Sequence, residues 1–536
     1  MVYTNRFFFG ISNQLRKFYL NSNIYDKKIS KIDATGLIYK PSPYLLSSLI
    51  KYQKKKFKIE DFALEDVWKY NNLNDKEYVA LNAFYWFFSL DLKSSKQTTQ
   101  TVLSNWINNN YKYNSKSWKF DLTAKRIIAW LSCHNLTYEE SDQNYKKNFN
   151  NIIKKQTNHL VNEISRSDLI EDKIIGCASI ILVGLCYQSE KNYLSFGTNI
   201  LKKISKLTLD NYGFPKTRNI KQLILYLKYF ILIREWFKES QVNIPEHIDE
   251  TIFYLGQGYA FFEENYGSNF LFNGNNLSNN DEFNNYLKRL GYKFQNENYE
   301  LGGYIKLRNK KISLTMDIGA TPSLNYTKDY QSGALSFEIT SNGQKLISNC
   351  GYYKKRDNKL NHLSKSSAAQ STLVIDDRSS CKFTKINKSW AVKKGLKIIK
   401  KSSVFEKNYW KIVASHDGYL KKYNTIHERE IEFYPEKMSF IGTDKIIKKK
   451  NNHNYKFDIR FHVEPNVKIM KTQDNKTVLI QLNDEGWKFT CDNYDIDIDN
   501  GLYFGKKNSY SENQNIFISG ISNNQTENIT WKIKKI

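Results

Sequence analysis

The sequence has few cysteines, no long apolar run and none of the short motifs of nucleotide or serine-hydrolase chemistry. Its six cysteines among 536 residues form no CxxC pair and no ladder of spacings, which excludes a zinc ribbon and a disulfide scaffold. The longest nearly apolar stretch, Ile174 to Tyr187, is shorter than the roughly 18 to 20 residues that cross a bilayer, so we expect a buried helix and no transmembrane segment. The first residues carry an apolar patch without a small-residue cleavage site, so we expect no secretory signal.

What the chain has in excess is positive charge. Lys and Arg number 81 against 54 Asp and Glu, a formal net charge of +27. Such a surface attracts polyanions, including nucleic acid, anionic lipid and acidic polysaccharide. A compositional bias of the genome is an alternative cause, because lysine, asparagine, isoleucine and tyrosine are abundant together. The lysines are scattered in short runs such as 54–56 and 448–450, so we expect no specific nucleic-acid partner.

Up to about residue 290 the apolar residues recur at a spacing of three to four, which predicts helices. Ile127, Ile128 and Leu131 are one such set. Proline and glycine separate the segments, as at 213–215 and 242–245, where helix breaks are expected. We therefore predict a helical domain over residues 1–290, built as an array of helices with short connections.

After about residue 300 the period changes to two. Ile312, Leu314 and Met316 alternate with polar residues, which predicts half-buried strands. Asn309-Lys310 and Asn342-Gly343 separate strand-like runs as hairpin turns do. Similar runs continue to the C-terminus, so we predict an antiparallel β-sandwich over residues 300–536 and an α+β, multidomain fold class.

A block of short motifs in the second half is more specific. It comprises Gly302-Gly303-Tyr304, Met316-Asp317-Ile318-Gly319, Gly333 to Glu338, Ser348 to Gly351 and Ala368 to Leu373. In this order and spacing the block resembles the β-domain signature of the heparinase II/III group, whose enzymes cleave uronic-acid polysaccharides by β-elimination. The resemblance implies an α/α toroid before the β-sandwich, and it alone suggests a periplasmic location. Segments such as Trp118 to Arg126 and Phe272 to Gly274 are most similar to a proteobacterial branch of this group.

The resemblance also implies a divalent metal site in the β domain, held by two histidines and an acidic residue. In this chain those positions are Gln331, Asn349 and Gln370, and Asp329 replaces a catalytic histidine of some members. Neutral amides bind zinc poorly beside His, Cys or carboxylate ligands. We therefore expect no tight zinc site and no other cofactor, while weaker binding of a divalent ion stays open. The three amides can instead hydrogen-bond one another and hold the shape of the site.

A lyase of this kind must neutralise a uronate carboxylate, remove the neighbouring proton and protonate the leaving oxygen, tasks for Arg, Asn, Gln, His and Tyr. Arg126, Trp130 and His134 are spaced four apart in a predicted helix and offer a cation, a stacking ring and an imidazole on one face. We predict that Arg126 is catalytic and that Trp130 and His134 contact substrate. The alternative is that Trp130 is core and Arg126 pairs with a carboxylate such as Asp121.

Arg218 and Asn219 precede the next predicted helix, where the resemblance places a polar turn that contacts substrate. The alternative is a helix cap, because Asn is a good capping residue. Tyr266 and Asn273 lie in a segment similar to the end of the toroid, where the family brings a cleft loop. We predict Asn219 and Tyr266 as catalytic, Tyr266 as base and acid, and Arg218 and Asn273 as substrate-binding. A structural Tyr266 is the alternative, because the chain has 37 tyrosines.

Together these features predict a polysaccharide lyase that acts on an acidic, uronate-containing glycan by β-elimination, with an acidic polysaccharide as its partner. The alternative is a catalytically impaired glycan-binding protein of the same fold, which Gln331, Asn349 and Gln370 motivate. A nucleic-acid binder is motivated by charge alone. The sequence defines neither the oligomeric state nor the compartment.

Overall fold

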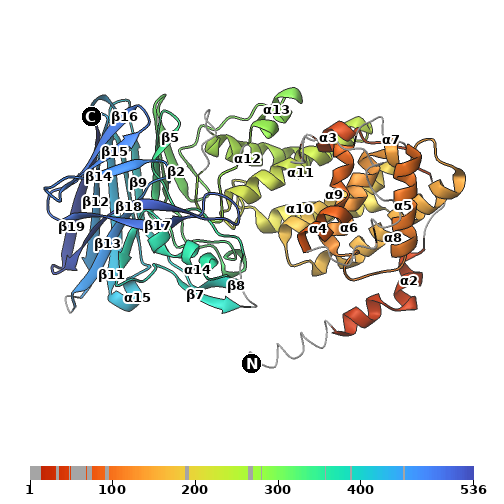
Figure 1. Ribbon diagram of the computed structural model, residues 1–536, viewed down its shortest axis with the longest axis horizontal. Helices are drawn as coiled ribbons and strands as arrows, with labels where there is room; N and C mark the ends of the chain where they lie inside the picture. Colours follow the sequence, from red (N-terminus) through yellow and green to blue (C-terminus); the bar gives the residue numbers. More distant parts are fainter. Residues whose placement is uncertain are drawn as a thin grey trace. The chain divides into compact units, whose positions relative to one another are not determined.

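The computed structural model of the chain divides into two compact units, whose helices and strands are labelled in Figure 1. The helical unit comprises residues up to Leu207, Leu225–Ile252 and Glu282–Gly291, and the β unit comprises Thr208–Ile224, Phe253–Asp281 and Tyr292–Ile536. The division into domains 1–290 and 300–536 stays a prediction. The residues that the structure describes are 14–31, 36–47, 49, 68, 75–90, 96–187, 192–263, 270–278, 280–355, 358–386, 389–450 and 453–536.

The helical unit is built from helices of varied length. They are α2 (Asn23–Ile29), α3 (Pro43–Ser47), α4 (Asp75–Ala83), α5 (Lys96–Asn110), α6 (Phe120–Ser132), α7 (His134–Thr137), α8 (Gln143–Glu163), α9 (Ile170–Cys186) and α10 (Tyr193–Thr208), with 3-10 turns η2 (Tyr85–Ser89) and η3 (Ile164–Arg166). Residues of α11 (Ile220–Glu239), α12 (Glu246–Phe262) and α13 (Asp281–Arg289) are divided between the two units. Asp142 caps α8, because its side chain accepts a hydrogen bond from Tyr145 N at 2.9 Å.

The core of the helical unit lies around α6, which packs against α8 and α9. Ile127, Ile128 and Leu131 are fully buried there, as the helical period predicts. Next to them Trp106 and Trp130 meet edge to face, with ring centres 5.3 Å apart. Edge-to-face packing suits the charge distribution of aromatic rings and adds to the stability that burial provides.

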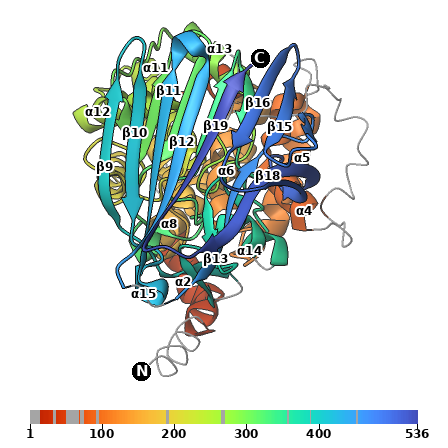
Figure 2. The same ribbon diagram turned by 90° about the vertical axis from the view of Figure 1, so that its left-hand side faces the viewer.

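The strands of the β unit form sheets in which neighbouring strands pair antiparallel. β1 (Glu300–Leu301), β2 (Tyr304–Arg308), β3 (Ile312–Asp317), β4 (Phe337–Ser341) and β5 (Gln344–Ile347) make a five-stranded sheet in that order. The eight-stranded sheet that faces the viewer in Figure 2 has the order β14 (Lys468–Lys471), β15 (Thr477–Leu482), β16 (Glu485–Cys491), β19 (Thr526–Lys535), β12 (Ser439–Lys448), β11 (Thr425–Tyr434), β10 (Trp410–His416) and β9 (Ile398–Phe405).

Two smaller sheets and short helices complete the β unit. A four-stranded sheet has the order β17 (Ile496–Tyr503), β18 (Ser511–Ser522), β13 (Tyr455–His462) and β6 (Leu373–Ile375), and β7 (Lys382–Ile386) pairs with β8 (Ser389–Lys394). The short helices are α14 (Lys359–Lys365) and α15 (Leu420–Tyr423), with 3-10 turns η4 (Leu324–Tyr326), η5 (Ser367–Ala369) and η6 (Pro435–Lys437).

One large apolar core joins the five-, eight- and four-stranded sheets. Its members include Leu314 on β3, Phe337 on β4 and Trp531 on β19, all buried. The rings of Phe337 and Trp531 stack 5.4 Å apart at an angle of 4°. Gly442 on β12 lies opposite Trp531, where an added Cβ would be 2.0 Å from the indole. The missing side chain therefore makes room for the ring.

The predicted fold class is confirmed, since helices precede antiparallel strands. The strand predicted from Ile312, Leu314 and Met316 is β3, but the prediction that it is half-buried is wrong, because its polar residues Ser313, Thr315 and Asp317 are buried as well. Asn342 and Gly343 have φ angles of +46° and +81°, the left-handed pair that a tight hairpin turn requires. Within the described parts of the chain, no helix combines the length and apolar character needed to cross a membrane.

Candidate functional site

A buried ion pair organises the polar centre of the β unit. Arg218 Nη2 lies 2.7 Å from Asp317 Oδ1, and both side chains are almost completely buried. The same guanidinium donates hydrogen bonds to Gly302 O at 2.9 Å and Gly303 O at 2.8 Å. Burial alone would lower the pKa of Arg218, but Asp317 and neighbouring phenols raise it above its ordinary value. Arg218 is therefore a permanent cation fixed at the end of β3.

The signature glycines make room for this cation. An added Cβ at Gly319 would lie 2.3 Å from Arg218 Cζ, and one at Gly303 would lie 2.9 Å from Arg218 Nε. Gly303 also has a φ of +78°, which side chains rarely adopt. Two of the glycines that mark the sequence block, Gly303 and Gly319, thus share a cause, which is the close approach of one guanidinium.

Tyr304 and Asn273 complete the buried cluster. Tyr304 Oη donates to the backbone oxygen of Arg218 at 2.7 Å, and its ring centre lies 4.5 Å from the guanidinium carbon. Asn273 Nδ2 donates to Tyr304 Oη at 2.6 Å and to Asp317 Oδ2 at 3.1 Å. Burial raises the pKa of the Tyr304 phenol above its ordinary range, so the phenol stays protonated and donates.

Asn219 uses its two amide atoms differently. Its Oδ1 accepts from Lys221 N at 2.9 Å and Gln222 N at 3.3 Å, which caps α11. Its Nδ2 faces Gly274, where an added Cβ would lie 2.6 Å from that nitrogen and 3.0 Å from Asp329 Cβ. The capping alternative is therefore present in the structure, and the amide nitrogen packs against Gly274, which also lies close to Asp329.

The three amides at the implied metal positions are engaged with surrounding groups. Gln331 Oε1 accepts from Gly274 N at 2.9 Å, and its Nε2 donates to Gly351 O at 2.9 Å and Ser364 O at 2.6 Å. Gln370 Nε2 also donates to Ser364 O, at 3.3 Å. The expectation that the amides bond to one another is wrong for these two, because they meet through the Ser364 carbonyl instead.

The Asn349 side chain is likewise engaged in hydrogen bonds with surrounding groups. Its Oδ1 accepts from Ser371 N at 2.9 Å, and its Nδ2 donates to Glu338 Oε1 at 3.2 Å. Since the oxygens of Gln331 and Asn349 already accept backbone hydrogen bonds, the three side chains do not fit a zinc ion, which prefers His, Cys or carboxylate. No group of three or more His, Cys, Asp or Glu is placed to hold a metal in the described stretches of the chain.

Arg126 and Trp130 lie in the helical unit and are fully buried. Arg126 donates to Ser117 O at 2.9 Å and Gln156 Oε1 at 3.2 Å, and its guanidinium carbon lies 4.1 Å from the Trp106 ring centre. Burial lowers the pKa of Arg126 to about 9. Trp130 packs as core, whereas Asp121 pairs with Lys125 at 3.1 Å instead of with Arg126.

The predicted common face of Arg126, Trp130 and His134 is interrupted. Helix α6 ends at Ser132, and His134 begins α7. His134 Nδ1 lies 3.1 Å from Glu139 Oε1, and burial lowers its pKa. The catalytic role of Arg126 and the substrate contacts of Trp130 and His134 stay predictions. Tyr266 lies outside the described residues.

The structure thus brings three predicted residues together in the β unit: Arg218, Asn219 and Asn273. Asp317 and Tyr304 were not predicted as site residues, although both belong to the signature motifs. A signal for them was present, because each stands within two residues of a signature glycine. Asp329 accepts a hydrogen bond from Tyr352 Oη at 2.8 Å.

Comparison with known proteins supports these observations. Residues 295–532 match the family model described as heparinase II/III-like, C-terminal. A solved heparinase III has a TM-score of 0.69 at 16% identity, with 92% of this chain and 84% of that chain covered. A heparan sulfate lyase HepC mutant from Pedobacter heparinus has a TM-score of 0.69 at 11% identity, covering 88% and 78%. No curated protein matches the chain in sequence.

These likenesses define the class of the fold, which is that of the heparinases: a helical toroid followed by an antiparallel β-sandwich. Residues 295–532 form a domain that is similar to the heparinase II/III-like C-terminal family. The proteobacterial branch stays a prediction.

Proposed function

We propose that this protein is a polysaccharide lyase that cleaves an acidic, uronate-containing glycan by β-elimination. The observation that carries the proposal is the placement of Asn219, whose amide nitrogen packs against Gly274 and which directly follows Arg218 of the Arg218–Asp317 ion pair. A fold alone does not define a reaction. The proposal therefore depends on a polar site of suitable chemistry within a heparinase fold.

Elimination beside a uronate carboxylate requires that negative charge be stabilised while the neighbouring proton leaves. An amide N–H is a suitable donor to a carboxylate, and Asn219 Nδ2 is held in place because its Oδ1 caps α11. The ion pair with Asp317 holds Arg218, the residue before this amide, and Asn273 hydrogen-bonds to the same carboxylate. We assign the proton transfers to Tyr266. A phenol can act as base and acid at neutral pH when a nearby cation or polar group lowers its pKa.

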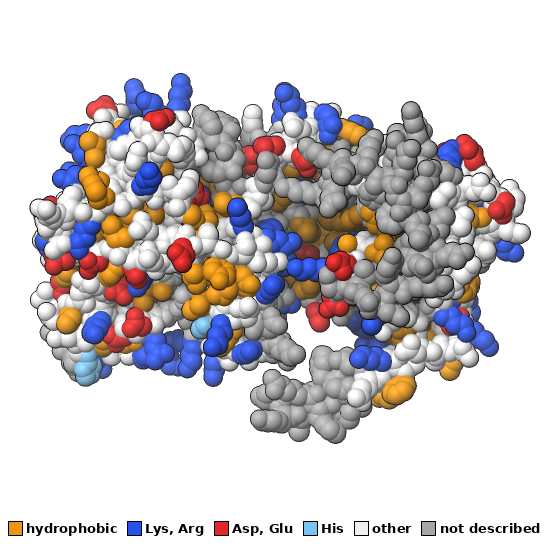
Figure 3. Space-filling model, in the orientation of Figure 1, with side chains coloured by type: hydrophobic (Ala, Val, Ile, Leu, Met, Phe, Trp, Pro, Cys, Tyr) orange, Lys and Arg blue, Asp and Glu red, His pale blue; other side chains and the backbone are white. Residues whose placement is uncertain are grey.

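Charge favours the same class of substrate. The formal net charge of +27 raises the local concentration of polyanions around the protein. Lys and Arg side chains are spread over the face seen in Figure 3 instead of forming one compact patch. A long acidic polymer can contact many such cations at once. The solved relatives are named heparinase III and heparan sulfate lyase, so we propose a glycosaminoglycan-like substrate.

The test is incubation of the purified chain with a panel of uronate polymers, followed by ultraviolet detection of the conjugated, unsaturated uronate that elimination leaves. We expect product from at least one polymer. If no polymer yields product, with or without added divalent ions, the proposal is wrong, and binding of the same polymers without turnover would identify a glycan-binding protein of this fold.

A further inference from the structure

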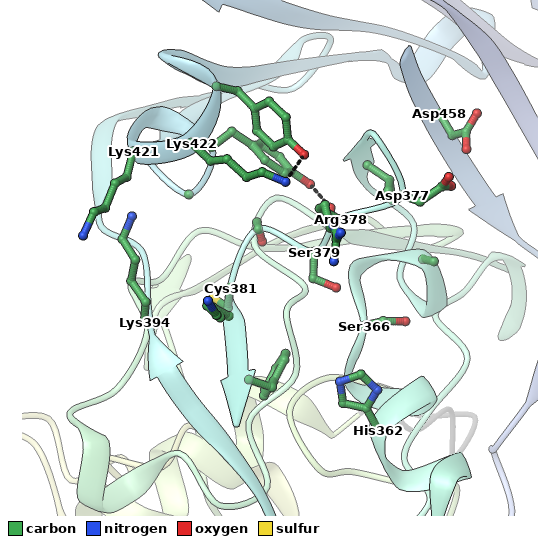
Figure 4. A pocket seen from close by; sticks show the side chains of 18 of the residues that line it. His362, Ser366, Asp377, Arg378, Ser379, Cys381, Lys394, Lys421, Lys422 and Asp458 are labelled. Carbon is green, nitrogen blue, oxygen red and sulfur yellow. Dashed lines mark hydrogen bonds between the residues drawn. The ribbon is translucent and has the colours of Figure 1, made fainter. Parts of the chain in front are cut away.

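A cavity lies in the β unit, and none of the residues at the Asn219 site lines it. Its volume is about 920 Å³, within the range of small-molecule sites. Figure 4 shows that its walls come from α14 with His362, the segment 377–383, the end of β8 with Lys394, and α15 with Lys421 and Lys422. The cavity is therefore assembled from segments far apart in the sequence.

Cations outnumber carboxylates around this cavity. The lining holds six Lys and Arg and two Asp; the cations are Arg378, Lys382, Lys394, Lys421, Lys422 and Arg460, and the carboxylates are Asp377 and Asp458. Asp458 already lies 3.6 Å from Arg460. Among the described residues, Arg378, Lys382, Lys394 and Lys421 have no side-chain hydrogen bond or ion pair. Positive charge in a concave surface concentrates the field and favours an anion.

Lys394 and Lys421 show most directly how the cations around the cavity repel one another. In Figure 4 their side chains extend toward each other across one side of the cavity. Burial and the neighbouring Lys421 charge both lower the pKa of Lys394. Two like charges at such a position repel each other, and an anion placed between them would relieve that repulsion.

The rest of the lining suits a saccharide. Tyr419 and Tyr423 line the cavity and are almost completely buried; Tyr419 Oη donates to Leu373 O at 2.9 Å and Lys422 Nζ donates to Tyr423 Oη at 3.0 Å. Ser366 and Ser379 line the side of the cavity away from Lys394 and Lys421, as Figure 4 shows, with Ser366 Oγ donating to Leu363 O at 2.7 Å and Ser379 Oγ accepting from Ser367 N at 3.0 Å. Hydroxyl and ammonium groups around a partly apolar lining can bind the polar groups of a sugar.

We propose that this cavity binds the sulfate or carboxylate groups of an acidic oligosaccharide, as a site separate from the one around Asn219. The choice of a saccharide draws on the proposed function, while the preference for an anion depends only on the cavity itself. A free sulfate or phosphate ion offers the same chemistry, and the experiment distinguishes the two sources.

Hydrogen–deuterium exchange of the full chain tests the proposal, because it localises binding whether or not the chain cleaves glycan. The probes are a sulfated uronate tetrasaccharide, a neutral tetrasaccharide and inorganic sulfate. We expect only the sulfated tetrasaccharide to protect peptides 377–383 and 418–423. The double variant Lys394→Gln/Lys421→Gln should need about tenfold more of it for equal protection, since charged hydrogen-bond donors are lost.

Lys385→Gln/Lys393→Gln is the matched control, because it removes the same charge from exposed residues of β7 and β8 that do not line the cavity. For equal protection, this control variant should need a concentration of the sulfated tetrasaccharide within about twofold of that for the wild type. Absence of protection at these peptides, or equal weakening by both double variants, would overturn the proposed site. Equal protection by inorganic sulfate would overturn the saccharide assignment. Protection without turnover would retain the cavity proposal and count against the lyase.

Discussion

Arg218 and Asp317 form a buried ion pair of 2.7 Å between the residue that precedes the cap of α11 and the last residue of β3. The pair joins segments 99 residues apart in sequence. Removing one partner of a buried pair leaves the other charge without compensation, which is costly. The ion pair therefore links the stability of the β unit to the position of Asn219, the residue that follows Arg218.

The substitution Asp317→Asn tests this linkage. We expect the free energy of unfolding of the β unit to fall by about 3 kcal/mol, because Arg218 would stay buried without its carboxylate. Asp497→Asn is a matched control, because Asp497 pairs with Lys471 at the surface and such pairs contribute about 1 kcal/mol or less. Urea unfolding followed by tryptophan fluorescence measures both. Equal losses in the two variants would contradict a special role of the buried pair.

The glycine next to the pair gives a second prediction. Gly319→Ala should destabilise the protein by about 1 to 3 kcal/mol, because the new methyl group would overlap the Arg218 guanidinium. Gly486→Ala is its control, since an added Cβ there meets no atom closer than 3.7 Å. A thermal melt of the two variants compares them. If Gly319→Ala is as stable as Gly486→Ala, the explanation of the signature glycines is wrong.

Stability should fall in acid because of two buried histidines. Burial lowers the pKa of His159 and of His462 to about 3, against an ordinary value of about 6.5 in the unfolded chain. As the pH falls below about 6.5 the unfolded state gains protons that the folded state does not, so stability is lost until about pH 3. At about pH 5 each histidine should cost about 2 kcal/mol.

Unfolding titrations at neutral pH and at about pH 5 measure this loss, and His462→Gln should show a smaller one. The two ring nitrogens of His462 lie 3.2 Å from Cys350 Sγ and 2.9 Å from Ala368 O. The substitution therefore also removes these contacts, and the stability of the variant at neutral pH measures that loss separately from the change in titration. If His462→Gln loses as much stability as the wild type between neutral pH and about pH 5, the lowered pKa of His462 does not cause the acid loss.

The two functions of Asn219 can be separated by choice of side chain. Asn219→Ser keeps an oxygen that can cap α11 but removes the amide nitrogen. We expect stability close to the wild type and a loss of lyase activity of about 100-fold or more, as for the loss of one donor to a developing charge. Asn219→Ala should lose the same activity and also about 1 kcal/mol of stability. Activity retained by Asn219→Ser would exclude the amide from the reaction.

Local patterns in the sequence predicted the elements of the fold well. The period of two at residues 312–318 identified β3, and Asn342-Gly343 identified a hairpin turn, because both depend on neighbouring residues alone. The ion pair of Arg218 was not predicted, because its partner is distant in the chain. Arg126 shows a different limit: a buried arginine and one facing a cleft have the same helical spacing, and only packing distinguishes them.

The most direct test of the central claim is the mass and ultraviolet absorbance of the fragments that the wild-type chain releases from a uronate polymer. β-Elimination predicts fragments that absorb in the ultraviolet and are lighter by one water than the products of hydrolysis, and Asn219→Ser should release about 100-fold fewer. Fragments that carry the added water, or no fragments from any uronate polymer, would contradict the account.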